Sequence, residues 1–188
     1  MRVFVFEFVT GGGGSAQGLA HAPSLAVEGD AMLKAVIADF VALGVDVVTL
    51  RSADLPPLGN AACEVQRITT RESLWTAVTQ TAAGADWTLI IAPETDGTLA
   101  ECCRRVLTAG GRLLGPGLET VQIAADKQAT AEWLAARGVA VAEGGVWRGA
   151  AAELREFPVV MKPRTGAGSQ GIALVKEPVD LAAYETAF

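Results

Sequence analysis

The chain has 188 residues, of which 51% are hydrophobic and 19% are charged, and its formal net charge at pH 7 is -6. This length and apolar content can bury a core of ordinary size, so we expect one folded domain or two small ones. The negative charge gives no general attraction to polyanions, which argues against nucleic acid as a partner. Every apolar stretch is far shorter than the roughly 20 residues of a membrane helix, so we expect a soluble protein.

The cysteine and histidine counts narrow the chemistry further. Cys63, Cys102 and Cys103 are an odd number of thiols, and the adjacent pair does not suit a structural disulfide, which favours a reducing, cytoplasmic location. We interpret Cys102 and Cys103 as part of a helix core, because neither has a histidine or a basic first turn beside it. The single histidine, His21, argues against His-based metal sites and a Ser-His-Asp triad.

The first fifty residues predict a β-loop-α-β unit. A nearly continuous apolar run at 3–8 indicates a strand buried on both faces of a parallel sheet, and the glycine-rich segment 11–15 follows it as a loop. Apolar residues recur at helical spacing over 25–43, and Gly44 offers a C-cap. A second buried strand is expected at 45–50, joined to the first by a right-handed crossover.

The alternation of strands and helices continues to residue 116. A strand is expected at 64–68, a helix at 71–83 and a further strand at 87–92. Asp96 is a candidate N-cap for a helix that runs to about Ala109, and a last short strand is expected at 112–114. These elements predict the α/β class, with an open, mostly parallel, Rossmann-like sheet in the N-terminal domain.

After residue 116 the pattern changes to that of a small α+β unit. Two helical stretches and four strand-like pieces are expected, at 119–125, 127–137, 139–142, 145–148, 159–162 and 172–175. The segment 178–188 is typical of a helix that has only begun. We therefore expect two domains, 1–116 and 117–188, the second of them incomplete.

The strongest signal for function is the apolar run 157–163, which contains Lys162, followed by a loop at 165–171 that is rich in glycine and hydroxyl residues. A lysine at the end of a buried strand is costly to desolvate unless an anion meets it, which makes Lys162 a candidate phosphate ligand. The glycines let backbone N–H groups approach phosphate oxygens. The alternative is a hairpin with a glycine-rich turn and a surface lysine.

A second candidate cation, Lys127, follows Asp126 at the opening of an expected helix. Taken alone, this pair is better explained by Asp126 as an N-cap and Lys127 as a solvated side chain. The order of Asp126-Lys127, the run 158–163 and the Gly/Ser loop, however, resembles ATP-grasp enzymes along the whole chain. In that superfamily a pre-ATP-grasp α/β domain precedes a small central domain and a larger C-terminal ATP-binding domain.

The resemblance implies that Lys127 and Lys162 contact the phosphates of ATP and that a loop closes over them. The loop residues are Thr165, Gly166, Gly168, Ser169 and Gly171. The implied reaction is phosphoryl transfer to a carboxylate, then attack of an amine on the acylphosphate, with Mg²⁺ neutralising the phosphates. The metal ligands and adenine hinge of the family are not found in this sequence. We therefore expect the chain to be a fragment that does not turn over by itself.

Within the superfamily, the segments 3–12 and 24–33 resemble the tyramine–glutamate ligases of methanofuran and methylofuran biosynthesis. This narrower resemblance implies glutamate as the carboxylate and an amine such as tyramine. Open α/β sheets bind ligands at the carboxyl ends of their strands. Candidate substrate contacts at such ends are Glu7, Thr10, Ser15 and Glu94, and ordinary loop or helix capping explains these residues as well.

Other readings stay open at this point. The segment 11–15 has the composition of an engineered linker, although removing it would leave the first strand unconnected. The whole chain could be a non-catalytic module that binds a nucleotide or another phosphorylated ligand. A small NAD-binding domain is disfavoured because the G-x-G-x-x-G fingerprint is missing. An incomplete second domain would expose apolar surface and favour a homo-oligomer.

Overall fold

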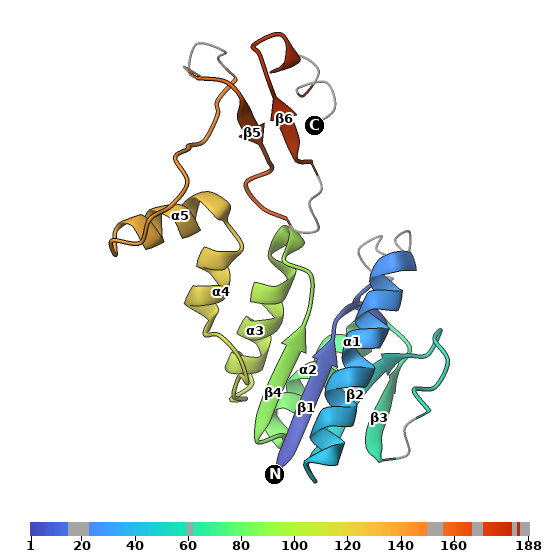
Figure 1. Ribbon diagram of the computed structural model, residues 1–188. Helices are drawn as coiled ribbons and strands as arrows, with labels where there is room; N and C mark the ends of the chain where they lie inside the picture. The colour runs from blue at the N-terminus through green and yellow to red at the C-terminus, as the bar shows by residue number, and fades with distance from the viewer. Residues whose placement is uncertain (15–22, 60–61, 150–155, 167–170, 182–183, 185–188) are drawn as a thin grey trace. The chain divides into compact units, whose positions relative to one another are not determined.

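The computed structural model describes residues 1–14, 23–59, 62–149, 156–166, 171–181 and 184. The chain divides into two compact units, the first made of residues 1–93 and 97–121 and the second of residues 94–96 and 122–188 (Figure 1). The domain boundary that the sequence suggests after residue 116 stays a prediction.

A parallel sheet of four strands forms the middle of the first unit (Figure 1). Its strands are β1 (Arg2–Glu7), β2 (Asp46–Ser52), β3 (Cys63–Ile68) and β4 (Trp87–Ile91), in the order β3-β2-β1-β4. Strand β1 is central and pairs with both neighbours, so that Phe4 lies opposite Val48 on one side and Thr88 on the other. The parallel sheet confirms the predicted α/β class.

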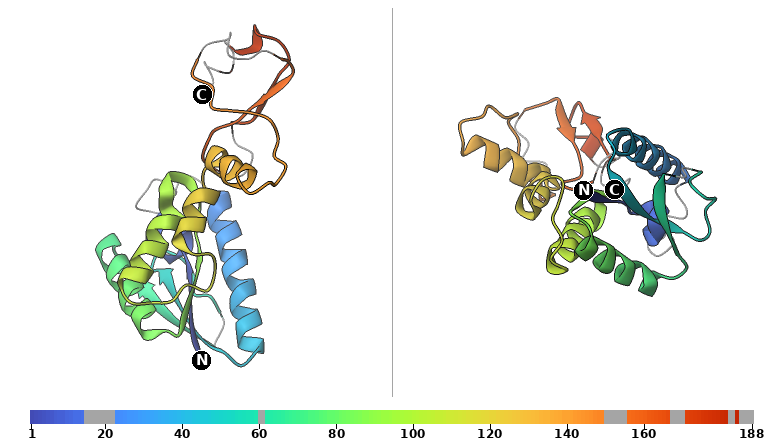
Figure 2. Two further views of the ribbon diagram at one scale, coloured as in Figure 1. Left: turned by 90° about the vertical axis from the view of Figure 1, so that its left-hand side faces the viewer. Right: turned by 90° about the horizontal axis from the view of Figure 1, so that it is seen from below.

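Helices cover both faces of the sheet, which explains why its strands are apolar throughout (Figure 2). These helices are α1 (Pro23–Ala42), α2 (Arg71–Gly84) and α3 (Thr98–Thr108). Val3 and Val5 of β1 pack with Leu33 of α1. The alternate residues Phe4, Phe6 and Phe8 belong to a second cluster that contains Leu74 and Val78 of α2 and Cys102 and Val106 of α3. Cys102 is thus a helix-core residue, as predicted.

The glycine-rich segment after β1 differs from the expected loop. Residues Val9–Gly13 form a short helical turn, η1, which is interrupted at Gly12 with φ at +112°. A Cβ on Gly11 would lie 2.7 Å from the Phe6 ring, and one on Gly13 would lie 2.4 Å from the Phe8 ring. The glycines are therefore part of the packed core, and this contact favours a native segment over an engineered linker.

Two expectations about the segment that follows β4 were wrong in detail. Asp96 does not cap helix α3, because it lies with φ at +53° in the turn η4 (Thr95–Gly97), and Gly97 takes the N-cap position instead. The expected strand at 112–114 is reduced to a single bridge between Leu113 and Thr88 of β4. That bridge still extends the parallel sheet beyond β4.

The second unit contains a helix and a short antiparallel ribbon. Helix α4 (Leu118–Ala124) begins in the first unit and ends in the second. The helix of the second unit is α5 (Lys127–Ala135), and the ribbon pairs β5 (Val159–Met161) with β6 (Ala173–Val175). The strands expected at 139–142 and 145–148 do not form, and these residues have no regular secondary structure and are mostly exposed. A local sequence pattern cannot reveal whether a segment of strand composition finds a strand to pair with.

The close approach of the glycines to the phenylalanine rings predicts how a glycine substitution changes the stability of the fold. Gly13→Ala places a methyl group against Phe8, and overpacking of this kind costs about 1–3 kcal/mol. Gly84→Ala is the matched control, because nothing lies within 4 Å of its added Cβ. Urea unfolding should show a clear loss of stability for Gly13→Ala and none for Gly84→Ala. Equal stability of the two variants would contradict the close approach of the turn to Phe8.

Candidate functional site

Glu7 is the last residue of β1, and its carboxylate closes the turn that follows. Glu7 Oε1 accepts a hydrogen bond from Val9 N (3.0 Å), while Oε2 accepts bonds from the backbone N and the Oγ1 of Thr10, each at 2.6 Å. Glu7 is only 2% exposed and Thr10 only 1%. The structure therefore brings these two candidates together, with the carboxylate serving as the cap that the sequence allowed. Their contact with a substrate stays a prediction.

Helix α1 comes close to this carboxylate because Gly29 has no side chain. A Cβ on Gly29 would lie 2.6 Å from Glu7 Cδ. Burial raises the pKa of Glu7 above its ordinary value, the hydrogen bonds from Thr10 and Val9 oppose the shift, and the charge of Asp30 adds to it. The geometry thus places a carboxyl group with a raised pKa at the carboxyl edge of the sheet.

A partly buried ion pair lies near the carboxyl end of the neighbouring strand, and sequence reasoning missed it. Arg51 of β2 is 3% exposed, and its Nη1 lies 2.6 Å from Asp30 Oδ1 while its Nε donates to Pro56 O. Burial raises the pKa of Asp30, but the pairs with Lys34 and Arg51 outweigh burial and hold that pKa below its ordinary value. The one available signal was an arginine directly after an apolar strand.

In the second unit, Asp126 caps helix α5, as the sequence predicted. Its Oδ1 accepts hydrogen bonds from the backbone N of Gln128 (2.9 Å) and of Ala129 (3.1 Å). Its Oδ2 lies 2.6 Å from Nε of Arg164, which follows β5. The Arg164 guanidinium holds the pKa of Asp126 below its ordinary value. One carboxylate therefore connects the start of a helix to a segment far along the chain.

Lys127 is connected to the same segment and is not merely a solvated side chain. Its backbone N donates to Arg164 O at 3.0 Å, and its Nζ donates to Gly166 O at 2.8 Å. Gly166 has φ at +96°, a conformation that favours glycine. Lys127 and the opening of the 165–171 loop, two parts of the predicted phosphate site, are thus in direct contact.

Lys162 directly follows β5, and its side chain is exposed. The premise that a buried strand carries this lysine was wrong, because Val160 in the middle of β5 is 58% exposed. An extended chain advances about 3.3–3.6 Å per residue, so the Lys162 Cα lies within about 7 Å of that of Arg164. Lys162 is therefore near the segment that binds Lys127, and its contact with phosphate stays a prediction.

The remaining candidates are less informative. Thr165 is exposed and Gly171 is half-buried, whereas Gly168 and Ser169 lie outside the described residues. Ser15 is also outside them. Glu94 is half-buried at the beginning of the second unit's segment 94–96. The predicted roles of these residues in binding phosphate or substrate stay predictions.

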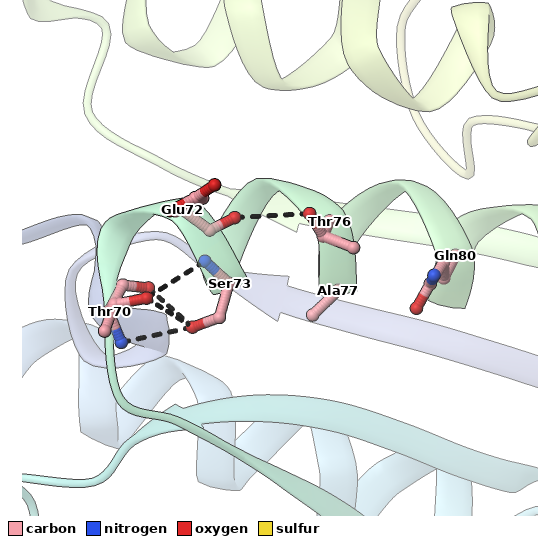
Figure 3. Close-up of a pocket in the computed structure, with 6 residues that line it drawn as sticks. All are labelled: Thr70, Glu72, Ser73, Thr76, Ala77 and Gln80. Atoms are coloured by element: carbon pink, nitrogen blue, oxygen red, sulfur yellow. Dashed lines mark hydrogen bonds between the residues drawn. The ribbon is translucent and has the colours of Figure 1, made fainter.

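A shallow depression of about 410 Å³ lies elsewhere, along the first turns of α2 (Figure 3). Its lining residues include Thr70, Ser73 and Gln80. Thr70 and Ser73 form a capping box, in which Ser73 N donates to Thr70 Oγ1 and Thr70 N donates to Ser73 Oγ, both at 3.1 Å. The polar groups there serve the start of the helix, and we assign no ligand to this surface.

The described part of the chain contains neither a cluster of metal-ligating side chains nor a membrane-spanning helix. Within it, no three His, Cys, Asp or Glu side chains gather closely enough to hold a metal ion. None of the described residues is given a metal-binding role here, since Mg²⁺ commonly needs only one or two carboxylates together with the phosphates of its substrate. None of the helices in the same ranges is long and apolar enough to cross a membrane.

Comparison with known proteins agrees with this architecture. Residues 45–121 match the family model of the pre ATP-grasp 3 domain. No curated protein matches the sequence.

Several solved structures share the fold. A protein of Archaeoglobus fulgidus assigned to the ATP-grasp superfamily is 21% identical, with a TM-score of 0.55, over 95% of this chain and 51% of that one. The L-amino acid ligase of Bacillus licheniformis is 16% identical, with a TM-score of 0.57, over 99% and 42%. A variant of Rhizobium etli pyruvate carboxylase is 18% identical, with a TM-score of 0.67, over 96% and 16%.

The chain spans about half the length of the first of these proteins and a smaller share of the other two. At these identities the similarity shows the fold alone. That fold is a parallel α/β sheet with helices on both faces, followed by a small unit, and the family model of the pre ATP-grasp 3 domain matches within its first part.

The raised pKa of Glu7 predicts the sign of a pH effect. A buried acid with a raised pKa binds its proton more tightly in the native state, so its contribution to stability increases as pH falls. Relative to Glu7→Gln, the wild-type free energy of unfolding should rise as pH is lowered from neutral, through the raised pKa, to the ordinary value of 4.5. Urea unfolding of both proteins across this range measures the difference. A difference that shrinks on acidification would mean that the three hydrogen bonds outweigh burial.

Proposed function

We propose that this chain provides part of an ATP-dependent ligase of the ATP-grasp type, which joins a carboxylate to an amine. The observation that carries the proposal is the contact of Lys127 Nζ with Gly166 O, which sets a cation at the opening of a glycine-rich loop. The match of residues 45–121 to a pre ATP-grasp domain and the shared fold support the same assignment.

In the proposed reaction, a carboxylate oxygen of the substrate attacks the γ-phosphorus of ATP, and the bond from phosphorus to the β,γ-bridging oxygen breaks to release ADP. The amine then attacks the acyl carbon and expels inorganic phosphate, leaving an amide after loss of a proton. Both steps concentrate negative charge on phosphate oxygens. Cations near those oxygens lower the barrier because they meet charge that is already present or develops there.

Lys127 and Lys162 are the proposed cations, and the loop at 165–171 is the proposed cover. Lys127 would exchange its bond to Gly166 O for a bond to a phosphate oxygen. The exchange replaces a neutral acceptor by a charged one, which makes a stronger hydrogen bond. Thr165, Gly166, Gly168, Ser169 and Gly171 would then close over the phosphates. ATP would arrive with Mg²⁺, whose ligands are not assigned to this chain.

The substrates are the finer part of the proposal. The resemblance of the segments 3–12 and 24–33 to tyramine–glutamate ligases makes glutamate the first carboxylate to test and tyramine the first amine. The solved L-amino acid ligase with a similar fold supports an amino acid as one substrate. Glu7 and Thr10 would reach an amine only by giving up part of their mutual hydrogen bonding, whereas Glu94 is free of that constraint.

Removing either cation should weaken nucleotide binding. In the protein encoded by the complete reading frame, Lys127→Met and Lys162→Met should each reduce ATP affinity about tenfold or more, because each removes a charged hydrogen bond to phosphate. Calorimetric titration with ATP measures the effect. Lys176→Met is the matched control, since Lys176 is an exposed lysine of the same unit that directly follows β6.

The outcomes separate the two functional readings. Unchanged ATP affinity in both variants would overturn the phosphate assignment. Lysine-dependent ATP binding without ADP release, in the presence of glutamate, tyramine and a panel of other amino acids and amines, would favour a non-catalytic nucleotide-binding module. Amide formation detected by mass spectrometry, with loss of activity in both variants, would support the ligase.

A further inference from the structure

The first amides of helix α5 already have acceptors. Lys127 N donates to Arg164 O, Gln128 N and Ala129 N donate to Asp126 Oδ1, and Thr130 N donates to Asp126 O. Amides at the start of a helix are normally free to bind an anion. Here they are occupied, so a phosphate that approaches the start of α5 must be met by side chains. The placement of the lysine ammonium groups therefore decides how well phosphate binds.

Two ammonium groups that converge on one phosphate site repel each other until the anion arrives. Lys127 lies next to Asp126 in the chain, and Lys162 lies two residues before Arg164. The Asp126–Arg164 ion pair, at 2.6 Å, joins the two backbones that carry the lysines. It acts alongside the backbone bond from Lys127 N to Arg164 O. The pair thus opposes separation of the two cations.

The Asp126–Arg164 ion pair contributes little to the stability of the fold. The Arg164 side chain is 56% exposed and the Asp126 side chain 22% exposed, and exposed pairs contribute about 0–1 kcal/mol. The capping role of Asp126 uses its Oδ1 and would be served equally well by asparagine. The negative charge on Oδ2 also lowers the local positive potential, which by itself disfavours phosphate. Any benefit of the ion pair to phosphate binding therefore comes from geometry.

We propose that Asp126 and Arg164 are positioning residues of the phosphate site, whose ion pair fixes the separation between Lys127 and Lys162. This inference rests on the proposed function. The proposal predicts the direction in which ATP affinity changes when the charge of Asp126 is removed. Removing the Asp126 charge would strengthen ATP binding if the residue acted only through its charge, and it weakens ATP binding if the residue acts by positioning.

Conservative variants separate positioning from folding. Asp126→Asn keeps an N-cap oxygen but loses the ion pair, and Arg164→Gln removes the guanidinium but keeps the carbonyl that accepts from Lys127 N. Arg137→Gln is the control, because the Arg137 guanidinium lies beyond the end of α5, over the ring of Trp133 and 3.5 Å from its centroid. The affinities to compare are those for ATP and for adenosine, which has no phosphates, measured by competition with a fluorescent ATP analogue.

Asp126→Asn and Arg164→Gln should each weaken ATP about three- to fivefold, the range for an exposed ion pair, and leave adenosine unchanged. The double variant should be no worse than the poorer single variant, because the residues act through one interaction. Arg137→Gln should change neither affinity.

Tighter or unchanged ATP binding by Asp126→Asn, or an equal loss for adenosine and ATP, would overturn the positioning role. Failure of the proposed function looks different. In that case Lys127→Met and Lys162→Met would leave ATP affinity at the wild-type value, whatever the two positioning variants do.

Discussion

A helix leaves its first amides without acceptors, and this constraint shapes both candidate sites. In the second unit, Asp126 and the carbonyl of Arg164 supply the acceptors for α5, which connects the helix to the segment after β5. In the first unit, Glu7 does the same for the turn after β1. Residues distant in sequence are joined because unpaired amides are costly. The contacts of Lys127 follow from that joining.

The carboxylates of Glu7 and Asp126 both accept hydrogen bonds from backbone amides, but their surroundings differ and shift their pKa values in opposite directions. Glu7 is buried and bonds to no cation among the described residues, so its pKa is raised despite three hydrogen bonds. Asp126 bonds to Arg164 near the surface, so its pKa is lowered. Burial therefore dominates at Glu7, whereas the cation dominates at Asp126.

The sequence predicted the regular elements well where periodicity reflects burial. Strand β1 is apolar throughout because helices cover both faces, and α1 shows its apolar spacing because one side packs on the sheet. Prediction failed where a distant partner decides the outcome. The segments 139–142 and 145–148 have strand composition but no strand to pair with in the described structure. The Arg51–Asp30 pair joins β2 to α1, and only the folded chain brings these residues together.

The revised position of Lys162 changes the argument for an anion site but keeps its direction. A buried lysine would need an anion to offset the loss of its hydration, whereas an exposed lysine can bind phosphate but does not need to. What favours phosphate is the local charge: Lys127, Lys162 and Arg164 lie close along two joined segments. Two carboxylates oppose these three cations, those of Asp126 and of Glu132, which also acts on Arg164. Screening limits each charge to about 8–10 Å at physiological salt. The net charge of -6 is therefore no barrier to ATP, because the triphosphate would respond mainly to this cationic group.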